Sequence, residues 1–259
     1  MRPLDPLAFH SDRLPVEHFD ERFSGDNLAF WVPLIVEAAR IEAGQHVLDV
    51  GCGTGGFTRG IADAASAIVT GLDSSPRFVA FAEQQPAPRR GAVRWLVGEA
   101  ETLPLENCSV DCVILSFVLH QLGRPDAAVA KAFRVLVGGG TVLVRTIAPE
   151  EAGKRVPARY LPSMAAADSA RLPPIDAVER WLVEAGFEPP TTRVVLRNKA
   201  LTFADEERQL AVEARCRYPF IGTDELERGV QLMRTDAERQ PGDWIDPRPT
   251  TFLVARKPG

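Results

Sequence analysis

The 259-residue sequence lacks the features that mark membrane-spanning, exported or nucleic-acid-binding proteins. No uninterrupted stretch approaches the roughly 20 apolar residues of a membrane span, and the first residues hold no apolar signal core. No run of about five basic residues occurs, and 30 Lys and Arg against 35 Asp and Glu give a formal net charge of −5. Because binding to a phosphate backbone needs a basic surface, we expect no nucleic-acid partner. We therefore expect a cytoplasmic protein.

Cysteine is also scarce, with four residues, at positions 52, 108, 112 and 216. Cys108 and Cys112 are four positions apart, but no second pair of cysteines or histidines lies near enough to complete a zinc-binding pattern. In a cytoplasmic chain these thiols should be reduced, and we interpret each as a small buried hydrophobic side chain. The sequence therefore predicts no metal site.

The arrangement of apolar residues predicts an α/β fold. Hydrophobic residues make up 45% and charged residues 25%, which is ordinary for a globular protein with a sizeable core. From residue 46 to residue 147, apolar runs of strand length alternate with helical patterns, which is typical of repeated βαβ units and a parallel sheet. The predicted strands cover residues 46–50, 67–73, 93–97, 110–115, 141–145, 193–196 and 251–256.

Two helices are predicted around these strands. The first has its apolar positions at Leu28, Trp31, Ile35 and Ala38, and it contains Pro33. Proline is tolerated in the first turn of a helix but not in its interior, so Pro33 is expected in a first turn. The second is a crossover helix between the fourth and fifth strands, with apolar residues between positions 128 and 136, and we expect the glycines at 138–140 to end it.

The pattern changes after residue 148. Prolines at positions 149, 157, 162, 173 and 174 divide the next segment, for which we predict a folded but irregular cover. Helical spacing returns at 178–185 and over about 205–239, where Leu226, Val230, Met233 and Ala237 form one apolar stripe that we interpret as core packing.

A cluster of glycines follows the first predicted strand directly. Gly51, Gly53 and Gly55 alternate where the strand turns into a helix, and glycine lets backbone amides approach a ligand closely. Gly51, Gly53 and Gly56 also satisfy G-x-G-x-x-G, and Asp73 lies 22 residues after Gly51, near the spacing of a ribose-binding carboxylate. Taken alone, this pattern leaves a dinucleotide open as the ligand.

The charge at the end of the first strand separates two kinds of ligand. Asp49 precedes the first glycine by two residues. A carboxylate there would attract a cationic amino-acid group, directly or through water, and would repel a pyrophosphate. Asp49 therefore favours a zwitterionic sulfonium compound over a dinucleotide.

Five segments in order resemble the motifs of class I S-adenosylmethionine-dependent methyltransferases. The similarity is to the type 11 branch, which includes the ubiquinone and menaquinone biosynthesis enzymes. The segments are 47–55 (VLDVGCGTG), 71–75 (GLDSS), 98–105 (GEAETLPL), 113–120 (VILSFVLH) and 134–141 (RVLVGGGT). The sequence departs from the family pattern at Gly138, where the family usually has proline, and at Glu99, where it often has aspartate. The resemblance covers about residues 15–147.

The resemblance implies a fold and a division of the chain. The expected fold is a Rossmann-like, doubly wound sheet of seven strands, mostly parallel, with an antiparallel C-terminal strand and helical cover insertions. We predict one domain over residues 1–259, in which residues 15–147 bind S-adenosylmethionine. Residues 148–180 and 200–240 would then face the substrate. Aromatic and soft apolar side chains there would suit a partly apolar molecule, or would fill a satellite core: Tyr160, Met164, Tyr218, Phe220 and Met233.

Cofactor-binding roles follow from the motifs. With Asp49, the resemblance implies that the loop residues Gly51, Cys52, Gly53 and Gly55 contact the cofactor. Asp73 and Ser74 would receive the ribose, although Asp73 also fits a helix N-cap. Glu99 would accept a hydrogen bond from the adenine amine and the Ala100 amide would donate to a ring nitrogen, whereas Glu101 is equally consistent with a solvated loop charge.

Two further residues lie after the fourth strand, where substrate and methyl group should meet. Ser116 begins the turn and is predicted to contact the cofactor. His120 is the candidate catalytic base for an acceptor that must lose a proton, with a structural histidine as the alternative.

Methyl transfer is an in-line displacement that needs mainly alignment of donor and acceptor, so no elaborate catalytic constellation is expected. We therefore predict a methyltransferase acting on an O, C or N atom of a small metabolite. The alternatives are a catalytically silent cofactor-binding or scaffold protein and an NAD-dependent oxidoreductase, which Asp49 and the motif at 98–105 disfavour.

Overall fold

The computed structural model describes residues 16, 25–204, 206–207, 210, 221–240, 242 and 244–259. The chain divides into two compact units. We call residues 15–146, 175–193 and 251–259 the large unit, and residues 1–14, 147–174 and 194–250 the small unit. The divisions at 193/194 and 250/251 fall within two long strands, β6 (Thr191–Leu201) and β7 (Trp244–Arg256).

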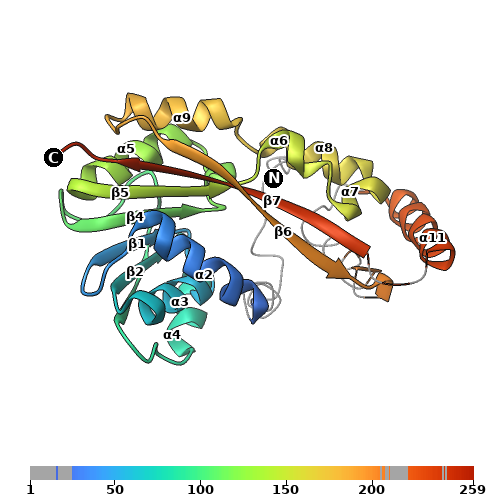
Figure 1. Ribbon diagram of the computed structural model, residues 1–259, viewed down its shortest axis with the longest axis horizontal. Helices are drawn as coiled ribbons and strands as arrows, with labels where there is room; N and C mark the ends of the chain where they lie inside the picture. Colours follow the sequence, from blue (N-terminus) through green and yellow to red (C-terminus); the bar gives the residue numbers. More distant parts are fainter. Residues whose placement is uncertain are drawn as a thin grey trace, which may run out of the picture. The chain divides into compact units, whose positions relative to one another are not determined.

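A seven-stranded sheet runs in the order β3-β2-β1-β4-β5-β7-β6 (Figure 1). The pairs β2–β3, β1–β2, β1–β4 and β4–β5 are parallel, whereas β7 is antiparallel to β5. The sequence prediction of a mostly parallel, Rossmann-like sheet with an antiparallel C-terminal strand is therefore confirmed. The first five strands are β1 (His46–Val50), β2 (Ile68–Asp73), β3 (Ala92–Val97), β4 (Val110–Ser116) and β5 (Leu136–Thr146).

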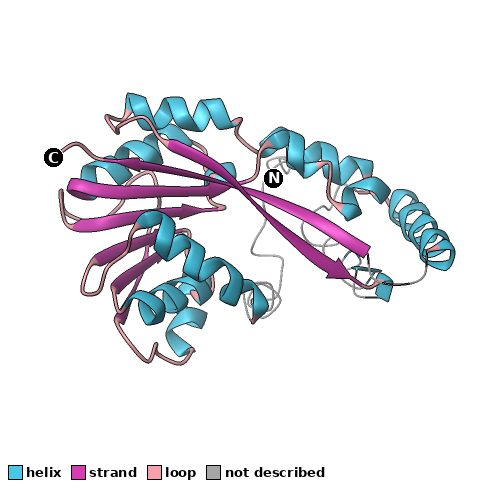
Figure 2. Cartoon of the chain, viewed as in Figure 1, coloured by secondary structure: helices cyan, strands magenta, loops and turns pink. Residues whose placement is uncertain are grey.

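Helices accompany the sheet in the large unit and make up much of the small unit (Figure 2). The helices of the large unit are α2 (Asp26–Ala39), α3 (Gly56–Ala65), α4 (Pro76–Gln84), the 3₁₀ helix η2 (Leu119–Gln121), α5 (Pro125–Val135) and α9 (Ile175–Glu184). Those of the small unit are α6 (Pro149–Ala152), α7 (Val156–Tyr160), α8 (Pro162–Arg171) and α11 (Thr223–Arg239).

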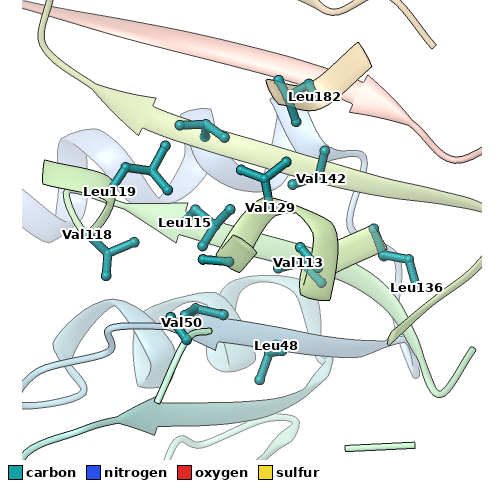
Figure 3. Close-up of a cluster of buried hydrophobic side chains, with 14 of the residues drawn as sticks. Leu48, Val50, Val113, Leu115, Val118, Leu119, Val129, Leu136, Val142 and Leu182 are labelled. Carbon is teal, nitrogen blue, oxygen red and sulfur yellow. The ribbon is translucent and has the colours of Figure 1, made fainter. Parts of the chain in front are cut away.

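The core of the large unit follows from side-chain alternation along the strands. Leu48 and Val50 of β1 point to the same face as Val113 and Leu115 of β4, and α5 and α9 cover that face (Figure 3). The intervening β1 residue Asp49 lies on the opposite face, where it is hydrogen-bonded to α3. Alternation thus places an apolar core on one side of β1 and a carboxylate on the other.

Two helix boundaries differ from the sequence prediction. Pro33 is the eighth residue of α2 rather than part of a first turn, and its side chain faces solvent. Burial of Trp31, Val32 and Ile35 on the other face offsets the helix hydrogen bond that Pro33 removes. The glycines at 138–140 do not end α5, which stops at Val135. They lie within β5, where a Cβ on Gly140 would come within 2.9 Å of the Asp111 carbonyl oxygen.

The segment after residue 148 is helical rather than irregular, so that prediction is wrong. Pro149, Pro157 and Pro162 each occupy the first or second position of a helix, namely α6, α7 and α8. At these positions the missing N–H costs nothing, because it would have no partner within the helix, and the fixed φ favours helical geometry. The prolines therefore start helices in this segment instead of preventing them.

One of the interpretations of the cysteines is also wrong. Cys112 is buried in β4 and Cys52 is partly buried, but Cys108 is exposed in the loop before β4. It has a φ of 50°, in the left-handed region. Cys216 lies outside the described residues.

Adjacent residues of α9 test the core packing. Leu182 is fully buried against the sheet, whereas Val183 is 50% exposed. We expect Leu182→Ala to lower the free energy of unfolding by about 2–5 kcal/mol, because it leaves a cavity. Val183→Ala should change it by about 0.5 kcal/mol or less. Urea unfolding of the two variants measures this, and equal effects would contradict the packing of α9 on the sheet.

Candidate functional site

Polar and glycine residues gather where the central strands of the large unit end. β1 ends before Gly51, β2 ends at Asp73, β4 at Ser116, and Arg145 is the penultimate residue of β5. Parallel pairing brings these ends to one edge of the sheet, and Ser116 lies opposite Arg145 in the register. Ligands of open α/β sheets bind at the carboxyl ends of the strands, so this edge is the candidate site.

The glycine loop has a backbone that only glycine adopts easily. Gly51, Gly53 and Gly55 have φ values of 74°, 54° and 76°. A Cβ on Gly51 would come within 2.6 Å of Val118, and one on Gly55 within 2.2 Å of Trp95. A Cβ on Gly53 would meet nothing within 4 Å, so the chain leaves space there. Gly51 and Gly55 thus allow close packing of the loop against neighbouring side chains, whereas open space lies beside Gly53.

Hydrogen bonds within the protein hold this loop. The amides of Gly51 and Cys52 both donate to the Leu72 carbonyl oxygen, at 2.7 and 3.0 Å, and the Gly55 amide donates to the carbonyl of Cys52 at 3.0 Å. We expected loop amides to face a ligand, but these three are already used. Burial, followed by the charges of Asp49 and Asp73, raises the pKa of the Cys52 thiol.

Asp73 ties β2 to the glycine loop. One carboxylate oxygen accepts from the Gly53 amide at 2.9 Å, and the other accepts from the Ser75 amide at 2.9 Å. Burial raises the pKa of Asp73, and these two bonds lower it. A carboxylate offers about four acceptor positions, so Asp73 retains capacity for a ligand's hydroxyl groups. Ser75 is the N-cap of α4, and Ser74 is exposed beside it.

Asp49 is a buried carboxylate at the start of α3. Its side chain is 2% exposed and accepts a 2.6 Å hydrogen bond from the hydroxyl of Thr58, the third residue of that helix. Burial raises the pKa of Asp49 to about 6, and its hydrogen bond with Thr58 and the charge of Arg145 oppose that rise. At neutral pH the group is mainly ionised. Its charge therefore faces the positive end of the helix dipole.

Sequence reasoning missed Arg145, which carries the positive charge of this edge. The residue is 3% exposed, and its guanidinium lies 4.2 Å from the ring of Trp31, 5.0 Å from that of Phe57 and 4.7 Å from that of Phe117. It also donates to the Ser116 hydroxyl at 3.3 Å. Arginine is rarely buried in proteins. An arginine at the end of an apolar strand was therefore the signal in the sequence that could have pointed to this residue.

The turn after β4 adopts an unusual conformation. Phe117 has a φ of 54°, in the left-handed region, and its amide donates to the Arg145 carbonyl oxygen at 2.8 Å. Such a conformation is strained for a bulky residue and persists where surrounding contacts enforce it. His120 follows on η2 and is half-buried.

The loop after β3 supplies the remaining predicted residues. Glu99 is exposed, whereas Ala100 is buried in the core of the large unit. The carboxylate of Glu101 accepts from the Arg124 amide at 3.4 Å, so it contacts the start of α5. The loop thus leaves Glu99 with its side chain accessible to a ligand.

The apolar residues predicted to face a substrate belong to the small unit. Tyr160, Met164 and Met233 are buried in one cluster with Val156, Leu161 and Leu210, and the Tyr160 hydroxyl donates to Asp236 at 3.0 Å. Tyr218 and Phe220 lie outside the described residues. The three described side chains therefore form the core of this unit.

The described residues contain no candidate metal site and no candidate membrane-spanning helix. In that part of the chain no three acidic, histidine or cysteine side chains gather closely enough to hold a metal ion. None of its helices is long and apolar enough to cross a membrane.

Residues 48–144 match the sequence model of the methyltransferase domain family, type 11. The ubiquinone/menaquinone biosynthesis C-methyltransferase UbiE of Rubrivivax gelatinosus is 38% identical over 113 residues, which are 44% of this chain and 43% of that protein. The chain spans about half the length of the curated relatives that it matches. The predicted resemblance to this branch of methyltransferases is confirmed.

Solved structures share the fold. A candidate methyltransferase from an antibiotic biosynthesis pathway of Anabaena variabilis aligns with a TM-score of 0.67 at 20% identity, covering 87% of this chain and 96% of that one. The [4+2]-cyclase SpnF aligns with a TM-score of 0.57 at 24% identity, covering 88% and 80%. At these identities the likeness extends to the fold alone.

The raised pKa of Asp49 predicts a gain in stability on removing its charge. Because the pKa of about 6 in the folded protein exceeds the ordinary aspartate value of 3.8, the stabilisation from the protonated carboxyl is complete below about pH 3.8. It is lost as the pH rises through about 6. Asp49→Asn, which can still accept from Thr58, should stabilise the protein at pH 7 by up to about 3 kcal/mol.

Unfolding by urea at pH 4 and pH 7 measures this effect. The gain from Asp49→Asn should be much smaller at pH 4 than at pH 7. Asp176→Asn, at a side chain that is 77% exposed, is the matched control and should change little. A destabilised Asp49→Asn variant at pH 7 would show that the ionised carboxylate stabilises the fold.

Proposed function

We propose that this chain, whose residues 48–144 match the methyltransferase domain family, transfers a methyl group from S-adenosylmethionine to a small molecule. The observation that carries the proposal is that three features lie together at the carboxyl ends of the strands: a buried carboxylate, a glycine with open space beside it, and a candidate ribose-binding carboxylate. Asp49, Gly53 and Asp73 supply these three features. All three lie within or beside the matched segment's first two strands.

The residues present fit this cofactor. Asp73 has unused acceptor capacity for ribose hydroxyls, and Gly53 leaves open space beside it. Glu99 would accept from the adenine amine, with the Ala100 amide donating to the ring. Ser74 and Ser116 flank the same edge, and Gly51, Cys52 and Gly55 fix the loop.

The same geometry disfavours a dinucleotide. In dinucleotide-binding folds the pyrophosphate lies at the N-terminus of the helix after the first strand, where the helix dipole is positive. Here the Asp49 carboxylate is hydrogen-bonded within the first turn of that helix. A dianionic group would meet its negative charge at close range, whereas a cationic amino group would not be repelled.

When bound, S-adenosylmethionine supplies an electrophilic methyl group on a sulfonium. The chain contributes mainly alignment, because in-line displacement needs donor and acceptor held on one axis. Asp73 and the glycine loop would hold one end of the cofactor, and Asp49 would attract its amino group. For an acceptor that carries a proton, we propose His120, on the 3₁₀ helix after β4, as the base that removes it.

The acceptor is a small, partly apolar metabolite. The curated relative carries the name of a C-methyltransferase, which favours carbon over oxygen or nitrogen as the acceptor atom. A fold shared with a cyclase does not by itself guarantee methyl transfer. Incubating the protein and a metabolite extract with methyl-labelled cofactor tests turnover directly. A protein that binds cofactor but labels nothing would be a silent binder.

Calorimetry distinguishes the two cofactor classes. We expect S-adenosylmethionine and S-adenosylhomocysteine to bind and NAD to give no heat of binding. The reason is that the carboxylate of Asp49, from β1, is hydrogen-bonded to the first turn of α3, where it would repel a pyrophosphate. NAD binding without a response to either methionine derivative would overturn the proposal.

A single substitution tests the ribose role of Asp73. Asp73→Ala should weaken S-adenosylhomocysteine binding by about 1.5–3 kcal/mol, the scale of hydrogen bonds to a charged group. Asp176→Ala, on α9, is the control and should leave the dissociation constant within about twofold. An unchanged constant for Asp73→Ala with a native circular dichroism spectrum would leave Asp73 only its structural role.

A further inference from the structure

The small unit contains a fully buried carboxylate that fixes the start of α7. Asp246 of β7 is 0% exposed, and one of its oxygens accepts from the Val156 amide at 2.8 Å. The other accepts from Arg248 Nε at 2.7 Å and lies 3.7 Å from an Arg155 Nη2 atom. These bonds join α7 to β7 within the small unit.

Among the described residues, several positively charged side chains surround this carboxylate. Lys199 interacts electrostatically with Arg155, Arg197 and Arg248, and Arg248 also interacts with Arg155. The described carboxylates near Lys199 or Arg248 are Glu206 and Asp246. Glu206 is 1% exposed. Burial and neighbouring arginines lower the pKa of both Lys199 and Arg248. Among the described residues, Arg155, Lys199 and Arg248 thus lie around the two carboxylates of Asp246 and Glu206.

Two charged donors in the cluster have no acceptor within the described part of the chain. Arg155 Nε and Arg248 Nη2 are buried atoms without a hydrogen-bond partner. The two side chains are only 23% and 26% exposed, so solvent reaches little of either. A buried charged donor without an acceptor is costly, and such a site calls for an anion.

Apolar and aromatic side chains adjoin the charged residues. Val156 follows Arg155 directly and belongs to the buried cluster of the small unit, and Trp244 packs against that cluster. The Trp244 ring stacks on Tyr160 with centroids 6.0 Å apart and meets the ring of Phe203 edge-on at 6.5 Å. The apolar and aromatic cluster of the small unit thus begins directly beside Arg155.

We propose that Arg155, Lys199 and Arg248 form an anion-binding site in the small unit that takes the carboxylate of an aromatic or otherwise apolar organic acid. Bidentate contacts suit a planar carboxylate, and the neighbouring rings suit its apolar body. The binding of this acid does not rest on the proposed function.

Titration with 2-naphthoate at constant ionic strength tests the site, with 2-naphthalenemethanol as the neutral analogue. The acid should bind saturably and the alcohol at least about tenfold more weakly. Lys199→Gln should weaken naphthoate binding by about fivefold or more, since Lys199 is partly exposed and its charge partly screened. Lys154→Gln, an exposed lysine paired with Glu151, should leave it within about twofold.

Arg155→Gln is a second variant with the same expected loss, for use if Lys199→Gln does not fold. Equal affinity for acid and alcohol would overturn the proposal, as would equal effects of the variants at positions 199 and 154. Inorganic phosphate that displaces naphthoate at lower concentration than acetate would assign the site to phosphate instead. Calorimetry with S-adenosylmethionine on the same protein tests the proposed function separately from the anion-binding site. Cofactor binding without naphthoate binding rejects this site alone, and the reverse rejects the proposed function alone.

Discussion

The hydrogen bond from Thr58 to the buried carboxylate of Asp49 is the contact on which the candidate site depends. It places a negative charge at the start of α3, on the face of β1 opposite the apolar core. The charge of Arg145 helps to keep that carboxylate ionised, and Arg145 is in turn held among three aromatic rings. The site is therefore an electrostatic arrangement that costs the fold stability.

Local patterns were enough to predict the sheet and most of the residues at its edge. β1 was predicted to the residue, because its apolar run ends in a glycine loop that can only be a turn. The hydrogen bond from the Gly53 amide to Asp73 could not be predicted from spacing, which favours a ribose-binding carboxylate and leaves a helix cap as the alternative. In the structure, the two carboxylate oxygens of Asp73 accept hydrogen bonds from the amides of Gly53 and Ser75.

The features that were missed depend on contacts between distant segments. Arg145 is buried because Trp31, Phe57 and Phe117 come from three other elements, which no local window contains. Pro33 lies inside a helix because burial of its neighbours outweighs local propensity. The prolines after residue 148 were interpreted as breakers, although their positions at helix starts make them favourable there.

The protonated state of Cys52 bears on the chemical durability of the glycine loop. Thiolates, not thiols, react with peroxide and alkylating reagents, and burial beside two carboxylates disfavours the Cys52 thiolate. This sulfur is thus shielded from oxidative damage although it stands in the middle of the loop. Cys108, exposed before β4, is instead open to such reagents, so a fluorescent label attached there would leave the loop unmodified.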